Sequence, residues 1–77
     1  MQARRALEAL IEHSGMSDRA VSLALGKAET WARNSKGRDT KTSTLAAVAD
    51  LAGVDVVLID RETGERLGVV DPPPRED

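Results

Sequence analysis

Apolar residues recur at three- and four-residue spacings in residues 3–14, with charged residues on the opposite side. This spacing predicts an amphipathic helix with one buried face. The same pattern returns in residues 42–52, where Thr42 or Ser43 is the expected N-cap. Both helices are followed by a glycine in the position of a C-terminal cap, Gly15 and Gly53.

Two shorter helices are predicted between these amphipathic segments. Ser17 is a good N-cap for a helix over residues 18–25, which Gly26 ends. The next helix is expected over residues 28–35, before a polar stretch that contains Gly37. The chain up to residue 52 is therefore predicted to consist of four helices and the turns or loops between them.

The pattern changes to β-branched residues after the last helix. Residues 54–60 are too short for a helix and predict a strand, and residues 65–70 predict the returning strand. The segment between them has turn composition, and Gly64 suits a positive φ in a bulged hairpin loop. Three consecutive prolines from Pro72 cannot donate ladder hydrogen bonds and are expected to end the sheet.

The predicted fold class is mainly α with a small β element, namely four helices followed by a C-terminal antiparallel β-hairpin. A chain of 77 residues has room for one small domain. We expect residues 1–54 to form its helical core and residues 55–71 to form a hairpin of the same domain. Residues 72–77 are expected to be a disordered tail.

Composition excludes several classes of site. With no Cys and one His, the chain offers no disulfide, no thiolate metal site and no histidine cluster. The serines have no companion histidine placed to make a nucleophile, and so small a chain has little room for a catalytic cleft. No apolar run is long enough to cross a membrane. We therefore expect a cytoplasmic protein without enzymatic activity, cofactor, metal or membrane partner.

Charge is segregated along the chain although the formal net charge is only −2. Residues 27–41 hold five basic side chains against two acidic ones, whereas residues 42–77 are strongly acidic. A local basic patch, not the total charge, decides whether a surface attracts phosphate. Residues 27–41 are therefore the candidate contact with an anionic polymer.

Several short motifs follow one another along the chain, and their order and spacing together resemble the Cro-like (XRE, phage-repressor type) helix-turn-helix family. They are Gly15-Met16-Ser17, Leu25-Gly26-Lys27, Gly37-Arg38 and the run from Ser43 to Val54. The resemblance covers about residues 7–54. It implies a lambda-repressor-like domain in which the helices over residues 18–25 and 28–35 form the DNA-binding unit.

The resemblance also implies which side chains would contact DNA. Base-reading positions would be Ala28, Glu29, Thr30, Arg33 and Asn34. Phosphate contacts would come from Ser17, Lys27, Lys36, Arg38, Lys41 and Thr42. Arg suits guanine and Asn suits adenine in the major groove, whereas phosphate contacts set register and affinity.

Trp31 is the only large apolar residue near the predicted third helix. Family members usually carry branched apolar residues at the places of Ala32 and Ser35, so this helix is short of core volume. We expect Trp31 to be buried and structural. The alternative is that Trp31 faces the DNA groove.

Both faces of the predicted hairpin are apolar, which is unusual for a ribbon with one side in water. One face can cover the helices, and the other needs a partner. We expect a homodimer seam formed by Val57, Ile59, Leu67 and Val69. The opposite face, with Val56 and Leu58, is the alternative seam.

These features predict a sequence-specific double-stranded DNA-binding regulator of transcription, acting as a repressor on an operator. A phage or mobile-element regulator and an antitoxin-type autoregulator both fit, and an antitoxin would also bind a toxin through its acidic C-terminal half. The alternative is an adaptor or antitoxin that uses the same helices to bind protein without reading DNA.

Overall fold

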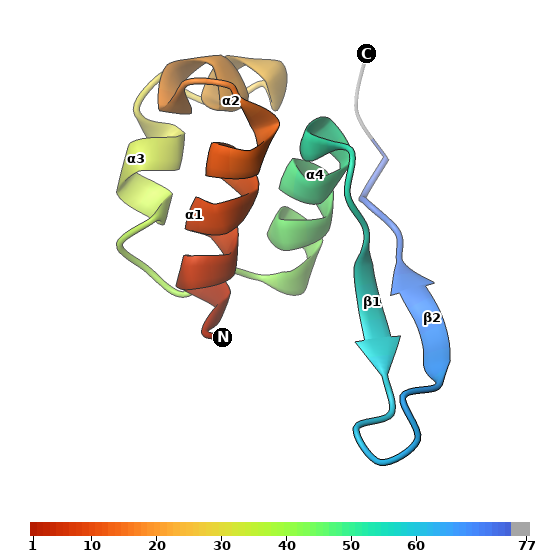
Figure 1. Ribbon diagram of the computed structural model, residues 1–77. Helices are drawn as coiled ribbons and strands as arrows, with labels where there is room; N and C mark the ends of the chain where they lie inside the picture. Colours follow the sequence, from red (N-terminus) through yellow and green to blue (C-terminus); the bar gives the residue numbers. More distant parts are fainter. Residues whose placement is uncertain (75–77) are drawn as a thin grey trace.

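A computed structural model describes residues 1–74 as four helices followed by a two-stranded antiparallel sheet (Figure 1). The helices are α1 (Ala3–Ser14), α2 (Asp18–Ala24), α3 (Trp31–Ser35) and α4 (Thr42–Ala52), and the strands are β1 (Val56–Ile59) and β2 (Arg66–Val70). The helices gather into one body, and the hairpin runs beside α4 and projects beyond it. The predicted mainly α class with a small antiparallel β element is confirmed.

The first two helices begin and end close to the predicted positions. Gly15 adopts the left-handed conformation (φ 73°) that a C-terminal capping glycine requires. The Ser17 hydroxyl accepts the Ala20 N–H at 3.1 Å and caps α2, as predicted. α2 ends at Ala24, one residue earlier than expected, and Gly26 (φ 72°) turns the chain towards α3.

The prediction of a helix over residues 28–35 is wrong at its start, because α3 begins at Trp31. In a helix starting at Ala28, the Ala32 N–H would donate to the Ala28 carbonyl. It donates instead to the buried hydroxyl of Ser22, over 2.9 Å. The Ala28 carbonyl accepts only the Trp31 N–H, over 2.9 Å, so residues 28–30 form a turn.

The predicted cap of α4 is also wrong. Lys41 occupies the N-cap position and makes no side-chain cap hydrogen bond, whereas Thr42 is already helical. Pairs of hydroxyl residues predict that a helix starts nearby, but they do not tell which residue leaves the helical conformation first. At the other end, Gly53 adopts the predicted left-handed conformation (φ 73°).

The core is small and aliphatic, as the composition predicts. It consists of the buried side chains Leu7, Ile11, Val21, Ala32 and Val48. Half-buried apolar residues surround it, namely Leu10, Met16, Leu25, Trp31, Leu45 and Leu51. α1 packs mainly on α4 and α2 packs mainly on α3, so each helix pair presents one face to this core.

The hairpin is closed by a short turn and has one irregularity. The Asp60 N–H donates to the Glu65 carbonyl, and the Asp60 carboxylate accepts the backbone N–H groups of residues 62 and 63. Gly64 has the predicted positive φ of 75°. A register shift follows Leu58, where β2 carries one extra residue. The sheet ends at Val70, before the prolines, and the predicted tail lies outside the described residues from residue 75 onward.

Candidate nucleic-acid interface

The connection between α2 and α3 is held from inside the protein. The Ser22 side chain is completely buried. Its hydroxyl donates to the Asp18 carbonyl over 2.8 Å and accepts the Ala32 N–H over 2.9 Å. The Lys27 N–H donates to the Ser22 carbonyl, also over 2.9 Å. One serine therefore joins the two helices and fixes the direction of α3.

The five candidate base-reading residues are all exposed, and they come from two kinds of backbone. Arg33 and Asn34 lie in α3 and follow the fully buried Ala32 directly, so both side chains point away from the core. The other three precede the helix in the turn that leads into it, namely Ala28, Glu29 and Thr30. The outward side of α3 and its leading turn therefore form one exposed polar surface.

The candidate phosphate contacts fall into three groups. Ser17 uses its hydroxyl oxygen to cap α2, and the hydroxyl hydrogen remains available as a donor. Lys36 is only partly exposed and is engaged within the protein. The remaining candidates are exposed, and within residues 1–74 no ion pair holds the charged ones; they are Lys27, Arg38, Lys41 and Thr42.

Lys36 is bound by an acid that lies at the start of α2. Its ammonium Nζ lies 2.8 Å and 3.1 Å from the two carboxylate oxygens of Asp18. Both side chains are about one-third exposed, at 30% and 31%. Asp18 also sits favourably in the first turn of α2, where the helix dipole attracts negative charge. This pair, unforeseen from the sequence, ties the end of α3 to the start of α2.

A second ion pair engages a candidate base-reading residue. The Arg19 Nε donates to the Glu29 Oε2 over 3.1 Å, and both side chains are mostly exposed. Exposed pairs of this kind contribute little to stability. Their effect here is to orient Glu29, whose second oxygen remains free to accept a hydrogen bond.

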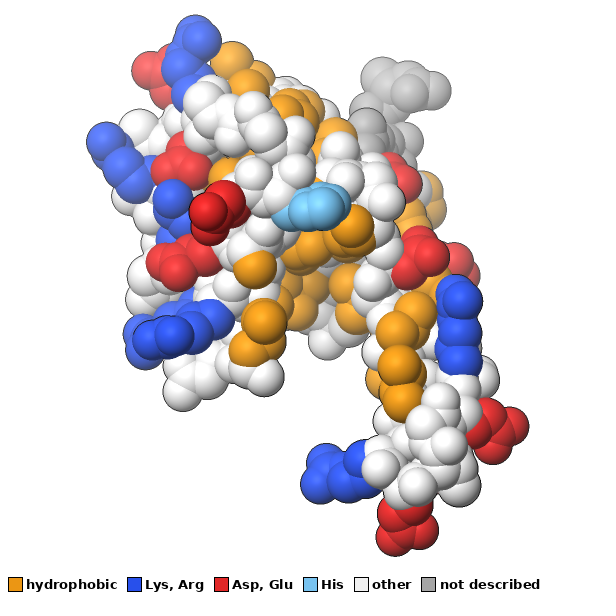
Figure 2. Space-filling model, viewed as in Figure 1, with side chains coloured by type: hydrophobic (Ala, Val, Ile, Leu, Met, Phe, Trp, Pro, Cys, Tyr) orange, Lys and Arg blue, Asp and Glu red, His pale blue; other side chains and the backbone are white. Residues whose placement is uncertain are grey.

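Cations and acids alternate on the α3 side of the molecule. Figure 2 shows blue and red side chains interleaved there, in contrast to the apolar atoms that follow the projecting hairpin. Because Asp18 and Glu29 each take one cation, the unpaired positive charge of this region rests on Lys27, Arg33 and the loop after α3. An anionic polymer would therefore be drawn to the outward side of α3 and its two flanking segments.

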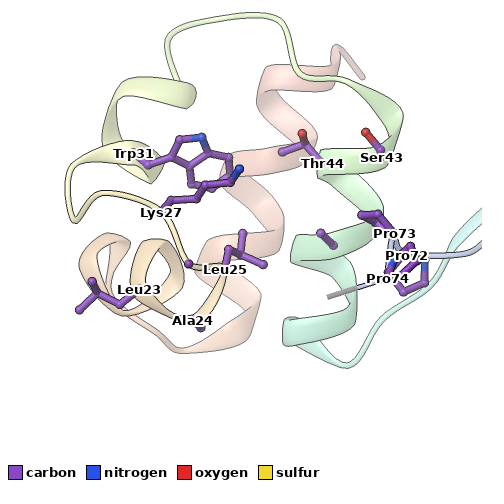
Figure 3. A pocket seen from close by; sticks show the side chains of 12 residues that line it. Leu23, Ala24, Leu25, Lys27, Trp31, Ser43, Thr44, Pro72, Pro73 and Pro74 are labelled. Atoms are coloured by element: carbon purple, nitrogen blue, oxygen red, sulfur yellow. The ribbon is translucent and has the colours of Figure 1, made fainter. Parts of the chain in front are cut away.

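A cleft of about 650 Å³ opens beside this surface (Figure 3). Trp31 and Lys27 lie on one side of it, the prolines at residues 72–74 lie on the other, and Ser43 and Thr44 of α4 lie between them. Trp31 packs against the core, but it is half-buried, not fully buried as predicted. Trp31 therefore packs against the core and also lines the cleft.

The four candidate seam residues share one face of the hairpin. Val57 is opposite Val69 in the ladder, and strand alternation puts Ile59 and Leu67 on the same side as this pair. The opposite face is formed by Val56, Leu58, Gly68 and Val70. Its base lies against Ala46 and Ala49 of α4 around a small hollow. Val69, one of the four seam residues, also lines this hollow, so the predicted seam is not wholly turned away from α4.

Other kinds of site find no support in the described part of the chain. In residues 1–74, no three His, Asp or Glu side chains gather as they would around a metal ion. Within the same residues, no helix has the length and hydropathy to cross a membrane. Searches found no matching family model, curated protein or solved structure for this sequence.

Proposed function

We propose that this protein is a sequence-specific double-stranded DNA-binding regulator of the helix-turn-helix type. The observation that carries the proposal is the pair Arg33 and Asn34, exposed side by side on a short helix whose inner residue, Ala32, is hydrogen-bonded to α2. Arg and Asn are the side chains that read guanine and adenine most directly in the major groove. The resemblance of the chain to the Cro-like family supports the same assignment.

In this proposal, α3 enters the major groove with its leading turn first. Arg33 and Asn34 reach base edges, while Glu29 and Thr30 contact the base pairs at the edge of the site. Lys27 precedes the helix, and two further cations, Arg38 and Lys41, follow it in the loop before α4. Cations on both sides of a reading helix hold it in register on the two phosphate backbones.

The biological role that follows is repression by occupation of a promoter. The regulator would act in the cytoplasm, as a homodimer on a two-fold operator, without cofactor, metal or catalytic activity. A phage or mobile-element regulator and an antitoxin-type autoregulator are both compatible with this role. An antitoxin would bind its toxin through the acidic C-terminal half.

Selection of bound duplexes from a random DNA pool by the full-length protein tests the proposal. We expect enrichment of one short motif and its inverted repeat. The double variant Arg33→Ala/Asn34→Ala should still bind the pool weakly but enrich no motif. If the unmodified protein also enriches none, the proposed function is wrong.

A second candidate function rests on the cleft beside α3. The half-buried indole and the prolines that line it are features of a peptide-binding groove, and this favours a protein-binding adaptor or an antitoxin that does not read DNA. In that case Trp31 fluorescence would respond to a protein partner and would be unchanged by any duplex. Trp31 is the only fluorescent aromatic residue in the chain, so the measurement has one source.

A further inference from the structure

Two neighbouring residues in the first turn of α2 form ion pairs around α3. Asp18 binds Lys36, directly after the last residue of α3, over 2.8 Å. Arg19 binds Glu29, two residues before α3 begins, through the 3.1 Å hydrogen bond from its Nε to the Glu29 Oε2. Glu29 is the only acid among the five candidate base-reading residues, so α2 supplies a cation to the one carboxylate on this surface.

The backbone on both sides of Glu29 is also held by hydrogen bonds. Before it, the Lys27 N–H donates to the Ser22 carbonyl over 2.9 Å. After it, the turn is closed by the Trp31 N–H, which donates to the Ala28 carbonyl over 2.9 Å. With its carboxylate tied to α2 as well, the mostly exposed Glu29 side chain has a defined direction. Its second oxygen, Oε1, has no hydrogen-bond partner within residues 1–74 and can accept one from a ligand.

A carboxylate on a DNA-binding surface needs a cation beside it, because the phosphates of the duplex repel an isolated acid. Arg19 neutralises Glu29 at 3.1 Å, so the two side chains together approach DNA without net charge. An exposed pair of this kind is weak in water. It becomes stronger where a bound duplex excludes water and lowers the local dielectric constant.

A carboxylate discriminates among the four bases because it accepts hydrogen bonds and does not donate them when ionised. In the major groove, guanine and thymine present acceptors, and adenine presents an acceptor beside its donor. Cytosine presents its amino group without an acceptor on the same base. Cytosine is therefore the base whose edge suits the free oxygen of Glu29 best.

We propose that Glu29 reads the amino group of a cytosine and that Arg19 is the residue that positions it. This inference rests on the proposed function and names one base of the target sequence. Because Glu29 lies in the turn that leads into α3, the cytosine lies at the edge of the base pairs that Arg33 and Asn34 contact. Arg19 acts through Glu29 and reads no base itself.

Selection of bound duplexes from a random pool, with the unmodified protein and with variants, tests this assignment. The unmodified protein should enrich a motif in which cytosine is preferred at least about fivefold over thymine at one position. Glu29→Gln should change the preference at this position alone to adenine, because a Gln amide pairs with both polar groups of the adenine edge. Arg19→Ala should reduce the cytosine preference to less than about twofold and leave the other positions of the motif unchanged.

Two further variants separate positioning from other roles of Arg19. Arg38→Ala removes a cation that forms no ion pair with Glu29 in residues 1–74. It should weaken binding to every duplex and keep the cytosine preference. Adding Arg19→Ala to Glu29→Ala should leave the preference at this position as it is in Glu29→Ala alone, because no carboxylate remains to be positioned. Circular dichroism melting checks that each variant folds.

The outcomes distinguish this inference from the proposed function. A motif without such a cytosine, or a cytosine preference that survives Glu29→Gln or Arg19→Ala, would overturn the inference and leave the function in place. A further change of preference when Arg19→Ala is added to Glu29→Ala would show that Arg19 contacts the base itself, and would overturn its positioning role. If the unmodified protein enriches no motif, the proposed function is wrong and the inference is wrong with it.

Discussion

Ser22 and Ala32, ten residues apart and both fully buried, are joined by a hydrogen bond from the Ala32 N–H to the Ser22 hydroxyl. The bond measures 2.9 Å and replaces the first backbone bond that a longer α3 would have made. The same hydroxyl donates to a carbonyl of α2, so it is satisfied as donor and acceptor. The position of α3, on which the candidate DNA contacts depend, therefore rests on one polar side chain in an aliphatic core.

Removal of this hydroxyl should destabilise the whole domain. Ser22→Ala leaves the Ala32 N–H buried without a partner, which costs ~1–3 kcal/mol of the free energy of unfolding. Urea denaturation measures the loss. Ser43→Ala is the control, because Ser43 is exposed and its substitution should stay within about 0.5 kcal/mol. Equal stability of the two variants would show that the buried bond is not important.

The Asp18–Lys36 pair predicts a gain of DNA affinity on substitution. Asp18→Asn removes the carboxylate that holds Lys36 and frees this cation for a phosphate. Affinity for any duplex should rise roughly 3- to 10-fold. The affinity should also fall more steeply with salt concentration, by the amount expected for about one additional phosphate contact.

Asp39→Asn is the matched control for this gain. It adds the same charge in the exposed loop after α3, but releases no paired cation. Fluorescence anisotropy over a range of salt concentrations compares the two. If Asp18→Asn and Asp39→Asn raise affinity equally, Lys36 makes no new contact and only net charge matters.

Local patterns predict much of this fold, and contacts between distant residues account for the errors. The spacing of Leu7 and Ile11 predicts α1 with its buried face, and Gly53 predicts the end of α4, because both signals are read within one or two turns of helix. The start of α3 depends on Ser22, which belongs to another helix. No pattern within residues 28–35 contains that information.

In the candidate site, too, local patterns predict some features, whereas others depend on residues far apart in the sequence. Exposure of Arg33 and Asn34 follows from helix periodicity and is present in the structure. The ion pair of Lys36 with Asp18 joins residues 18 positions apart, and it engages a residue that is also a candidate phosphate contact. Charge counting along the sequence finds a basic segment, but it cannot tell which cations are already bound.

Substitutions on α3 and in the loop after it should separate base reading from phosphate contact. Arg33→Ala should cost ~1–3 kcal/mol of binding free energy on the preferred duplex and relax the preference at one base pair. Arg38→Ala should weaken binding to preferred and scrambled duplexes alike. It should also reduce the slope of log affinity against log salt concentration by about one. Titration of both duplexes by both variants measures this. An equal loss on the two duplexes for Arg33→Ala would assign it to phosphate.

Trp31 should contribute to stability through its packed side alone. Burying a whole Trp is worth ~3–5 kcal/mol, so truncation of this half-buried residue to Ala should cost about 2 kcal/mol of the free energy of unfolding. Leu23→Ala is the control, because Leu23 lines the same cleft but is 50% exposed and lies outside the core cluster. Thermal melts compare the two variants. Equal melting temperatures would mean that Trp31 contributes no more to stability than Leu23 does, and that its role is confined to lining the cleft.

The central claim, that the α3 surface reads a DNA sequence, is tested most directly by a ratio of two affinities. The unmodified protein is titrated with its best selected duplex and with a scrambled duplex of equal length and composition, at a physiological ionic strength of about 0.15 M. We predict a preference of at least about 10³-fold for the selected duplex, as specific regulators show. A ratio below about tenfold would mean that the protein binds DNA by charge alone, and would contradict the claim.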